Sequence, residues 1–254
     1  PYISGSRGDV RRKDLYAYDQ PKSTTSEAFR GIRTAISYSS RETDHRVYLV
    51  TSSGPKEGKS TITINVATVM AYSGTKTILV DADLRRPRIH KSFDLDNTVG
   101  LTNVIIGDVS VEEAVQPTAV DNLYVLPSGP IPPNPSELLG RDRMLGVLDE
   151  LRGGYDRIML DTPPIGAVTD AAVLGRIVDS VILVVHAGRT RKKLIERGLE
   201  QLSQIDVDVA GVVLNNLRIG RKRYSPGYYD YYYYSSYYGG DDESRPRRKD
   251  AKRV

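Results

Sequence analysis

Short apolar runs alternate with segments of helical periodicity along most of the chain. The pattern predicts strands at Val47–Thr51, Thr77–Val80, Leu123–Leu126, Arg157–Leu160, Ser180–Val185 and Val209–Leu214. It predicts helices at Ser60–Tyr72, Pro135–Leu151, Thr169–Ile177 and Arg191–Ile205. Strands rich in Val, Ile and Leu that alternate with helices are typical of a mostly parallel sheet with helices on both faces. We therefore predict a three-layer α/β fold, in which ligands bind at the carboxyl ends of the strands.

The two ends of the chain differ from this central part. Residues 1–22 are polar and predict a linker. Thr24 and Glu27 then form a capping-box pattern, which predicts the start of a helix and of a domain over residues 23–220. Residues 221–254 are mainly Tyr, Gly, Ser, Asp and Arg, with little to bury. They predict a disordered C-terminal tail.

The amino-acid composition excludes several kinds of site and segment in this chain. The 254 residues include no cysteine, which excludes disulfides and thiolate metal sites. No apolar run approaches the ~18 residues that a transmembrane helix requires. The chain begins at Pro1 and not at a Met, so we expect it to be part of a longer polypeptide that could include a membrane anchor. Basic residues cluster at both ends and are either solvated or close to an anionic membrane. No motif predicts a nucleic-acid partner.

A candidate phosphate site lies between the first strand of the sheet and the helix after it. Residues 53–61 read SGPKEGKST, close to the P-loop pattern, although its first glycine falls at Ser53 and a glycine follows one place later. In such a loop, backbone N–H groups and the helix N-terminus hold phosphates. Lys59 would reach the β- and γ-phosphates, Ser60 would bind Mg²⁺, and Thr61 would contact the α-phosphate region. The predicted ATP contacts are Gly54, Pro55, Lys56, Glu57, Gly58, Lys59, Ser60 and Thr61.

Three carboxylates follow predicted strands. Asp81 and Asp83 end one strand on the same side, and Asp161 ends another. A single Asp at such a place often caps a helix, but three beside a P-loop are typical of an oxygen-ligated Mg²⁺. We predict Ser60, Asp83 and Asp161 as metal ligands, and Asp81 as the group that orients or deprotonates an acceptor hydroxyl. The predicted catalytic residues are Lys59, Asp81, Asp83 and Asp161.

Two further groups of residues have open roles. Asn215 ends the last predicted strand and could either contact adenine or form a turn. A basic cluster after the fifth predicted strand could contact phosphates or a neighbouring subunit, or simply be the solvated start of a helix. It consists of Arg189, Arg191, Lys192 and Lys193.

Several motifs together resemble the bacterial tyrosine kinases. The P-loop, the segment 78–87 (ILVDADLRRP) and the segment 160–166 (LDTPPIG) look like the Walker A, A′ and B motifs of that family. Thr169-Asp170-Ala171 also looks like that family. Glu27, Arg30 and Arg33 match its E-x-x-R-x-x-R oligomerisation helix. The resemblance covers about residues 24–238 and ends in a tyrosine cluster like the family's autophosphorylation tail.

The resemblance implies a protein tyrosine kinase that uses ATP and Mg²⁺. Phosphorylation would pass between the subunits of a homo-oligomeric ring that regulates capsular and exopolysaccharide synthesis and export. Expected partners are a transmembrane modulator (fused or separate), protein substrates and a phosphotyrosine phosphatase. The expected location is the cytoplasm, at the inner face of the membrane. The expected phosphoacceptors are Tyr224, Tyr228, Tyr229, Tyr231, Tyr232, Tyr233, Tyr234, Tyr237 and Tyr238.

Two alternatives remain open from the sequence. Partitioning and division-site ATPases share the fold, but they carry a signature lysine at the position of Gly54 and lack a tyrosine tail. A non-catalytic, nucleotide-gated assembly module would bind ATP and transfer nothing. Phosphotyrosine on the purified protein would distinguish the kinase from both.

Overall fold

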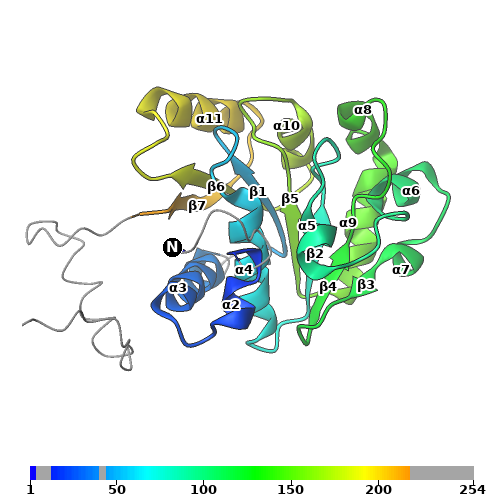
Figure 1. The fold of residues 1–254 in the computed structure, drawn as a ribbon. Coiled ribbons are helices and arrows are strands. Elements are labelled where there is room, and N and C mark those ends of the chain that lie inside the picture. Colours follow the sequence, from blue (N-terminus) through cyan, green and yellow to red (C-terminus); the bar gives the residue numbers. More distant parts are fainter. Residues whose placement is uncertain (4–12, 40–43, 218–254) are drawn as a thin grey trace, which may run out of the picture. The chain divides into compact units, whose positions relative to one another are not determined.

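A twisted, mostly parallel sheet forms the centre of the domain. The computed structural model describes residues 1–3, 13–39 and 44–217. Within them, seven strands lie in the order β3-β4-β2-β5-β1-β6-β7, and only the β3–β4 pair is antiparallel (Figure 1). The strands are β1 Val47–Ser52, β2 Thr77–Asp81, β3 Gln116–Pro117, β4 Leu123–Leu126, β5 Arg157–Asp161, β6 Ser180–His186 and β7 Val209–Asn215. The six predicted strands are confirmed, and β3 is too short to give a periodic signal.

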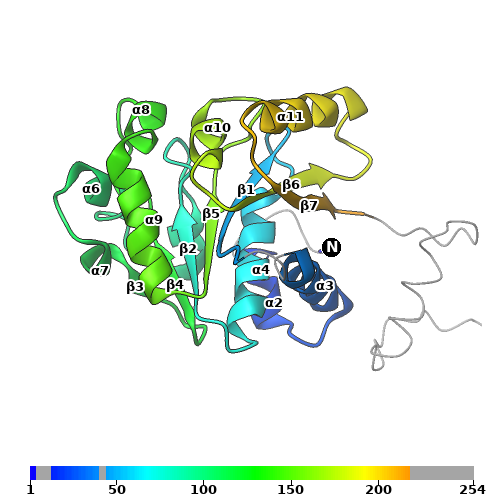
Figure 2. The same cartoon turned by 180° about the vertical axis from the view of Figure 1, so that it is seen from behind.

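Helices cover both faces of the sheet, as Figures 1 and 2 show from opposite sides. On one face, α2 (Tyr16–Asp19), α3 (Thr24–Ser39) and α4 (Lys59–Ala71) pack against buried side chains such as Tyr48 and Met159. The other face of the sheet packs against a second group of helices, some long and some short. These are α6 Leu101–Ile106, α7 Val111–Ala114, α8 Pro135–Leu139, α9 Asp142–Gly154, α10 Asp170–Gly175 and α11 Lys192–Gln204. The predicted three-layer α/β fold is confirmed.

One predicted helix is in fact two. The sequence pattern predicts a single helix over Pro135–Leu151, but α8 ends at Leu139 and α9 begins at Asp142. Arg141 between them has an extended backbone, with φ −75° and ψ 148°. Apolar side chains of both helices, among them Leu138 in α8 and Met144 in α9, belong to the same core cluster.

The N-terminal segment is folded where the sequence predicts a linker. Leu15 and Ala17 are buried against α4. The side chain of Asn65 in α4 accepts a hydrogen bond from the Ala17 N–H at 2.7 Å and donates to the Lys13 carbonyl at 3.1 Å. The prediction of a linker over residues 1–22 is therefore wrong from residue 13 onward. Although this segment is mostly polar, the burial of Leu15 and Ala17 and the hydrogen bonds of the Asn65 side chain hold it against α4.

Helix α3 is capped one residue earlier than predicted. The Ser23 hydroxyl accepts the N–H of Ser26 at 3.2 Å, while Thr24 already lies inside the helix. The Glu27 side chain pairs with Arg30 in the same helix, while the Glu27 backbone N–H donates to the Ser23 carbonyl at 3.1 Å. Among the described residues, no helix is both long and apolar enough to cross a bilayer. The predicted tail and its tyrosines lie outside the described residues.

Candidate active site

The P-loop turns at the carboxyl end of β1 and leads directly into α4. Gly58 has a φ of +89°, which favours glycine, and α4 begins at Lys59. The loop borders a cavity of about 700 Å³, whose other walls come from the segment after β2 and from Pro163–Val168 after β5. The N-terminus of α4 therefore adjoins an open space, as phosphate binding requires.

Lys59 lies among the predicted carboxylates. Its Nζ atom is 3.1 Å from Asp83 and 3.4 Å from Asp161. Asp81 and Asp161 are paired residues on the neighbouring strands β2 and β5, so the sheet itself sets their separation. Burial would lower the pKa of Lys59, but the charges of Asp161 and Asp83 outweigh it and hold the pKa above its usual value. The structure thus brings all four predicted catalytic residues together.

Asp81 is fully buried, and only one of its two carboxylate oxygens has hydrogen-bond partners in the protein. Its Oδ2 atom accepts the backbone N–H groups of Arg88 and Ile89 at 3.0 and 2.9 Å. Its Oδ1 atom has no protein partner. Burial, together with the charge of Asp161, raises the pKa of Asp81 to about 7. A carboxyl group with such a pKa can exchange a proton near neutral pH.

The donor set fits Mg²⁺ bound together with phosphate. Burial raises the pKa of Asp161, and hydrogen bonding from Ser60 opposes it. The Oδ2 atom of Asp161 is buried without a partner. Across the described residues, no three His, Cys, Asp or Glu side chains are arranged to hold a metal by themselves. Mg²⁺ commonly takes one or two carboxylates and completes its shell with water and phosphate oxygens. Ser60, Asp83 and Asp161 remain the predicted ligands on that basis.

Two of the predicted ATP contacts use their side chains inside the protein. Thr61 donates its hydroxyl to Asp14 at 2.6 Å. The carboxylate of Glu57 accepts the Gly54 N–H at 3.1 Å and the hydroxyl of Thr190. These two side chains therefore stabilise the conformation of the P-loop. A nucleotide contact from either residue would come from its backbone.

The predicted adenine contact, Asn215, also faces the P-loop. Its side-chain nitrogen donates to the Glu57 carbonyl at 2.9 Å. The same nitrogen lies against Gly58, where any β-carbon would overlap it. Asn215 thus couples the end of β7 to the phosphate loop, a role that its position at a strand end does not reveal.

An ion pair between exposed Arg85 and buried Asp170 connects the loop after β2 to the start of α10. Arg85 donates to Asp170 at the start of α10, with distances of 2.8 and 2.9 Å. Arg85 also donates to Ser136 at 2.9 Å. Burial would raise the pKa of Asp170, but its bonds to Arg85 and Ser136 and the charge of Arg85 hold it below its usual value. Sequence patterns could not reveal this pair, because its members lie far apart in the chain.

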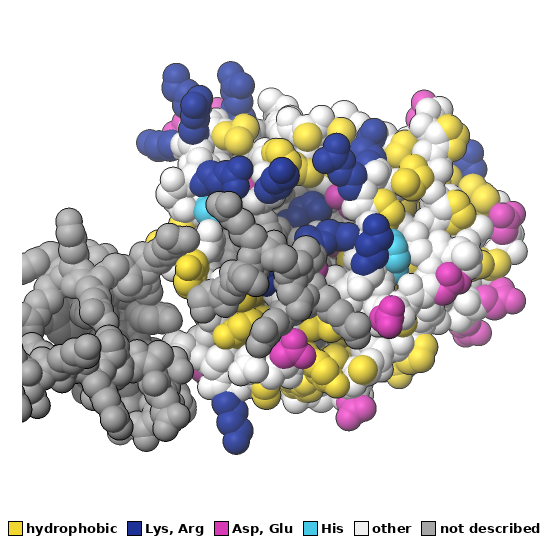
Figure 3. Space-filling model, viewed as in Figure 1, with side chains coloured by type: hydrophobic (Ala, Val, Ile, Leu, Met, Phe, Trp, Pro, Cys, Tyr) yellow, Lys and Arg dark blue, Asp and Glu magenta, His cyan; other side chains and the backbone are white. Residues whose placement is uncertain are grey.

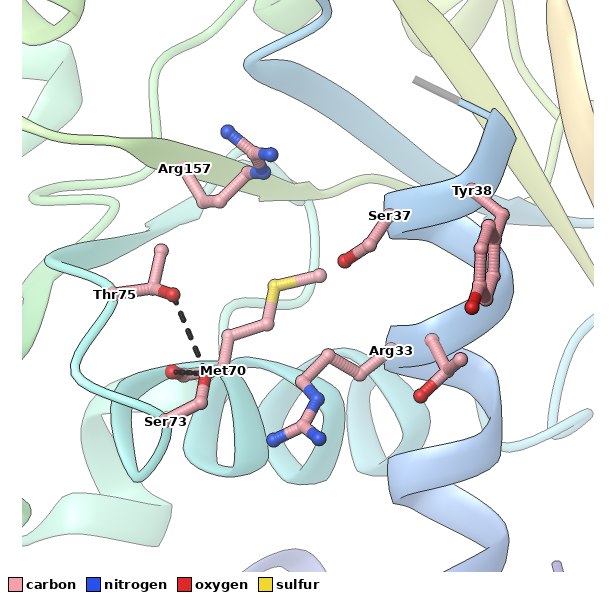
Figure 4. Close-up of a pocket in the computed structure, with 8 residues that line it drawn as sticks. Arg33, Ser37, Tyr38, Met70, Ser73, Thr75 and Arg157 are labelled. Carbon is pink, nitrogen blue, oxygen red and sulfur yellow. Dashed lines mark hydrogen bonds between the residues drawn. The ribbon is translucent and has the colours of Figure 1, made fainter. Parts of the chain in front are cut away.

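The three residues of the predicted oligomerisation motif do not form one cluster. Glu27 and Arg30 pair within α3. Arg33 donates to the Val69 carbonyl at 3.1 Å, near the end of α4. Arg33 also borders a small pocket of about 300 Å³, with Arg157 on another wall and Met70 at its base (Figure 4). The role of the motif in assembly stays a prediction.

The predicted basic cluster after β6 lies on the surface. Arg189, Arg191, Lys192 and Lys193 are all exposed, and Lys192 is 3.4 Å from Glu196. Figure 3 shows lysine and arginine side chains gathered over the upper part of the molecule, near α11, and Lys56, Arg85 and Arg86 also line the cavity. These cations attract anions to the surface of this face, whereas the carboxylates Asp81, Asp83 and Asp161 lie buried within the site.

Comparison with known proteins decides the family. Residues 54–216 match the family model described as an AAA domain. Tyrosine-protein kinase YwqD of Bacillus subtilis is 42% identical over 224 residues, which cover 88% of this chain and 94% of that protein. The chain therefore belongs to the bacterial tyrosine kinases.

Other bacterial tyrosine kinases differ in length. Tyrosine-protein kinase etk of Escherichia coli is 36% identical over 89% of this chain, which is 31% of that protein. The solved kinase domain of the same protein superposes with a TM-score of 0.79 at 33% identity, covering 89% of this chain and 88% of that domain. The family thus includes proteins of about this length and much longer ones.

A more distant likeness concerns the nucleotide. The septum site-determining protein MinD of Pyrococcus horikoshii, solved with Mg-ADP, superposes with a TM-score of 0.59 at 26% identity, covering 70% of this chain and 72% of that chain. This weaker match is to the division-site group considered above. The fold is therefore shared between both groups, while the identity favours the kinases.

Proposed function

We propose that this kinase transfers the γ-phosphoryl group of ATP to tyrosines in its own C-terminal cluster, between subunits of a homo-oligomer. The observation that carries the proposal is the Lys59 ammonium held between Asp83 and Asp161 at the N-terminus of α4. Phosphoryl transfer needs positioning and neutralisation of charge more than covalent chemistry. The cavity beside these groups offers room for both a nucleotide and an acceptor side chain.

Each residue has a definable part in the transfer. Mg²⁺, when bound, neutralises charge on the phosphate oxygens. Lys59 moves from its carboxylate partners to the β- and γ-oxygens and stabilises the charge that develops there. Asp81 accepts a proton from the tyrosine hydroxyl, because its Oδ1 atom is free of protein partners. Without that help a tyrosine, with a reference pKa near 10, is a poor nucleophile at neutral pH.

The wider role follows from the family resemblance. We propose that the kinase regulates capsular or exopolysaccharide synthesis and export from the cytoplasmic side of the membrane. A transmembrane modulator, fused or separate, would recruit it there, and a phosphatase would reset it. The exposed basic residues near α11 are suited to an anionic environment.

The test is incubation of the purified protein with Mg-ATP, followed by mapping of phosphosites. Phosphotyrosine at Tyr224–Tyr238 is expected in the wild type, with none in a Lys59→Met variant. Nucleotide binding without any phosphotyrosine would favour the non-catalytic assembly module.

A further inference from the structure

A buried carboxylate outside the predicted site connects two walls of the nucleotide cavity. Asp14 has no exposed surface. It accepts hydrogen bonds from Thr61 at 2.6 Å and from Ser92 at 2.8 Å, and it forms an ion pair with Arg88. Thr61 belongs to the helix of the P-loop, while Arg88 and Ser92 belong to the segment after Asp83. A fully buried carboxylate is stable only with such partners.

Arg88 is the partner closest to the chemistry. It borders the cavity, and its backbone N–H donates to Asp81. Its positive charge acts on Asp161, one of the predicted metal ligands. Within the described part of the chain, Arg88 forms one ion pair, with Asp14. A guanidinium freed from Asp14 would be attracted toward Asp161, a carboxylate that the predicted Mg²⁺ site uses.

We propose that Asp14 is a positioning residue for phosphoryl transfer: it keeps the Arg88 side chain away from the metal-binding carboxylates. It also fixes the P-loop helix relative to the segment after Asp83. The proposal rests on the proposed kinase function. It gives the folded N-terminal segment a role at the active site, because Asp14 is attached to α4 by its neighbours Lys13 and Ala17 through Asn65.

A purely structural role predicts something different. If Asp14 only attaches the N-terminal segment to the domain, its replacement lowers the free energy of unfolding and leaves the Mg²⁺ requirement unchanged. If Asp14 restrains Arg88, its replacement raises the Mg²⁺ requirement, because a mobile guanidinium competes with Mg²⁺ for carboxylates. Removal of the Arg88 charge should then reverse the effect.

The experiment compares Asp14→Asn, the double variant Asp14→Asn/Arg88→Gln, and Asp19→Asn as an exposed acidic control in the same segment. The first readout is the Mg²⁺ concentration that gives half of the rise in melting temperature with ADP. The second is the rate of autophosphorylation at saturating ATP against Mg²⁺. For Asp14→Asn, we expect the Mg²⁺ requirement to rise by ~10-fold or more, the effect typical of outer-shell partners of metal ligands.

The double variant should return toward the wild type in both readouts, and Asp19→Asn should match the wild type. An unchanged Mg²⁺ requirement in Asp14→Asn overturns the proposal. Failure of the double variant to recover overturns the part played by Arg88. If Asp14→Asn does not fold, Arg88→Lys tests the same contact, because the lysine ammonium lacks the forked N–H groups of the guanidinium. An unchanged Mg²⁺ requirement in Arg88→Lys would also overturn the proposal. Failure of the kinase function itself would appear separately, as absence of phosphotyrosine in the wild type.

Discussion

The side-chain amide of Asn215 occupies the space that a β-carbon on Gly58 would need. With any other residue at position 58, the Asn215 side chain would have to move and give up its present contact with the phosphate loop. The positive φ of Gly58 also favours glycine at this position. The loop is shaped by a contact from the far end of the domain sequence as well as by its own residues.

The first prediction concerns this contact. Gly58→Ala should lower the free energy of unfolding by more than the ~1–3 kcal/mol that backbone strain alone costs, and it should weaken nucleotide binding. Gly74→Ala is the matched control, because Gly74 has a similar positive φ with open space around it. Urea denaturation and nucleotide titration measure both effects. Equal destabilisation in the two variants would show that the Asn215 contact is unimportant.

The second prediction concerns the transfer step. Lys59→Met and Asp81→Asn should each abolish phosphotyrosine and leave the domain folded, because losing one such group costs roughly 3–4 kcal/mol of transition-state stabilisation. Lys91→Met, at an exposed lysine, should keep normal activity. Phosphotyrosine blotting and circular dichroism provide the measurements. Near-normal autophosphorylation in Asp81→Asn would remove Asp81 from its assigned role.

The third prediction is a pH dependence of stability without Mg²⁺. Burial, with the charge of Asp161, raises the pKa of Asp81 from 3.8 to about 7 in the folded state, so ionising Asp81 opposes folding. The stability that the protonated group contributes is fully present below about pH 3.8 and is lost as pH rises through about 7. Asp81→Asn should thus be more stable than the wild type at pH 8, by at most ~4 kcal/mol at ~1.4 kcal/mol per pKa unit.

Chemical denaturation across pH in the presence of a chelator tests this expectation. The difference between Asp81→Asn and wild type should shrink toward pH 4. Asp121→Asn, at an exposed position, should show no such trend. A difference that is constant with pH would mean that the Asp81 carboxyl group does not titrate between these values.

The fourth prediction concerns assembly. The combination Glu27→Ala and Arg33→Ala should produce monomers by light scattering and weaken autophosphorylation. The exposed pair Arg143 and Glu150, 2.7 Å apart on α9, offers a matched double-alanine control. The surface pairs Glu27–Arg30 and Arg143–Glu150 contribute only ~0–1 kcal/mol to stability, and the Arg33–Val69 hydrogen bond adds ~1–3 kcal/mol. Both double variants should therefore remain folded. Unchanged mass across a wide concentration range, in parent and variant alike, contradicts the prediction.

The fifth prediction links phosphorylation to dissociation. Each phosphate adds about −1.5 to −2 charges at neutral pH, so three or four would outweigh the net charge of +4 of the whole chain. A phosphorylated tail would be repelled by the carboxylates around the active site. The unmodified protein should sediment as closed oligomers and the phosphorylated protein as smaller species. Identical sedimentation before and after Mg-ATP, with Lys59→Met alongside, would exclude the tail as a switch.

The sequence predicted those parts of the site that depend on one strand and the turn after it. Asp81, Asp83 and Asp161 could be placed because strand alternation and parallel order bring strand ends to one edge. Asp14 could not be found in this way, because its importance depends on partners from two other elements. The short helices α5 (Ile89–Phe93), α6 and α7 were missed for another reason: each contains too few turns for a periodic pattern to emerge.

The side chain of Asn215 shows the limit of local reasoning most directly. Its position at a strand end was compatible with adenine recognition or a turn, and no neighbouring residue distinguishes the two. The actual partner, the Glu57 carbonyl, is brought there by the pairing of β7 with β6 and of β6 with β1. Such a contact requires the order of strands, which the sequence pattern does not give.

The pairing of Asp81 with Asp161 on adjacent strands has a consequence for how this protein can change. One residue inserted into or deleted from β2 or β5 would turn the following side chains to the opposite face and separate the two carboxylates. Both strands are buried on their two faces, so the same change would exchange side chains between the cores on either side of the sheet and disrupt the packing of both. Length variation in descendants of this gene, or in engineered libraries, should therefore be confined to the loops, and the spacing within these two strands should be far less tolerant of insertions than of substitutions.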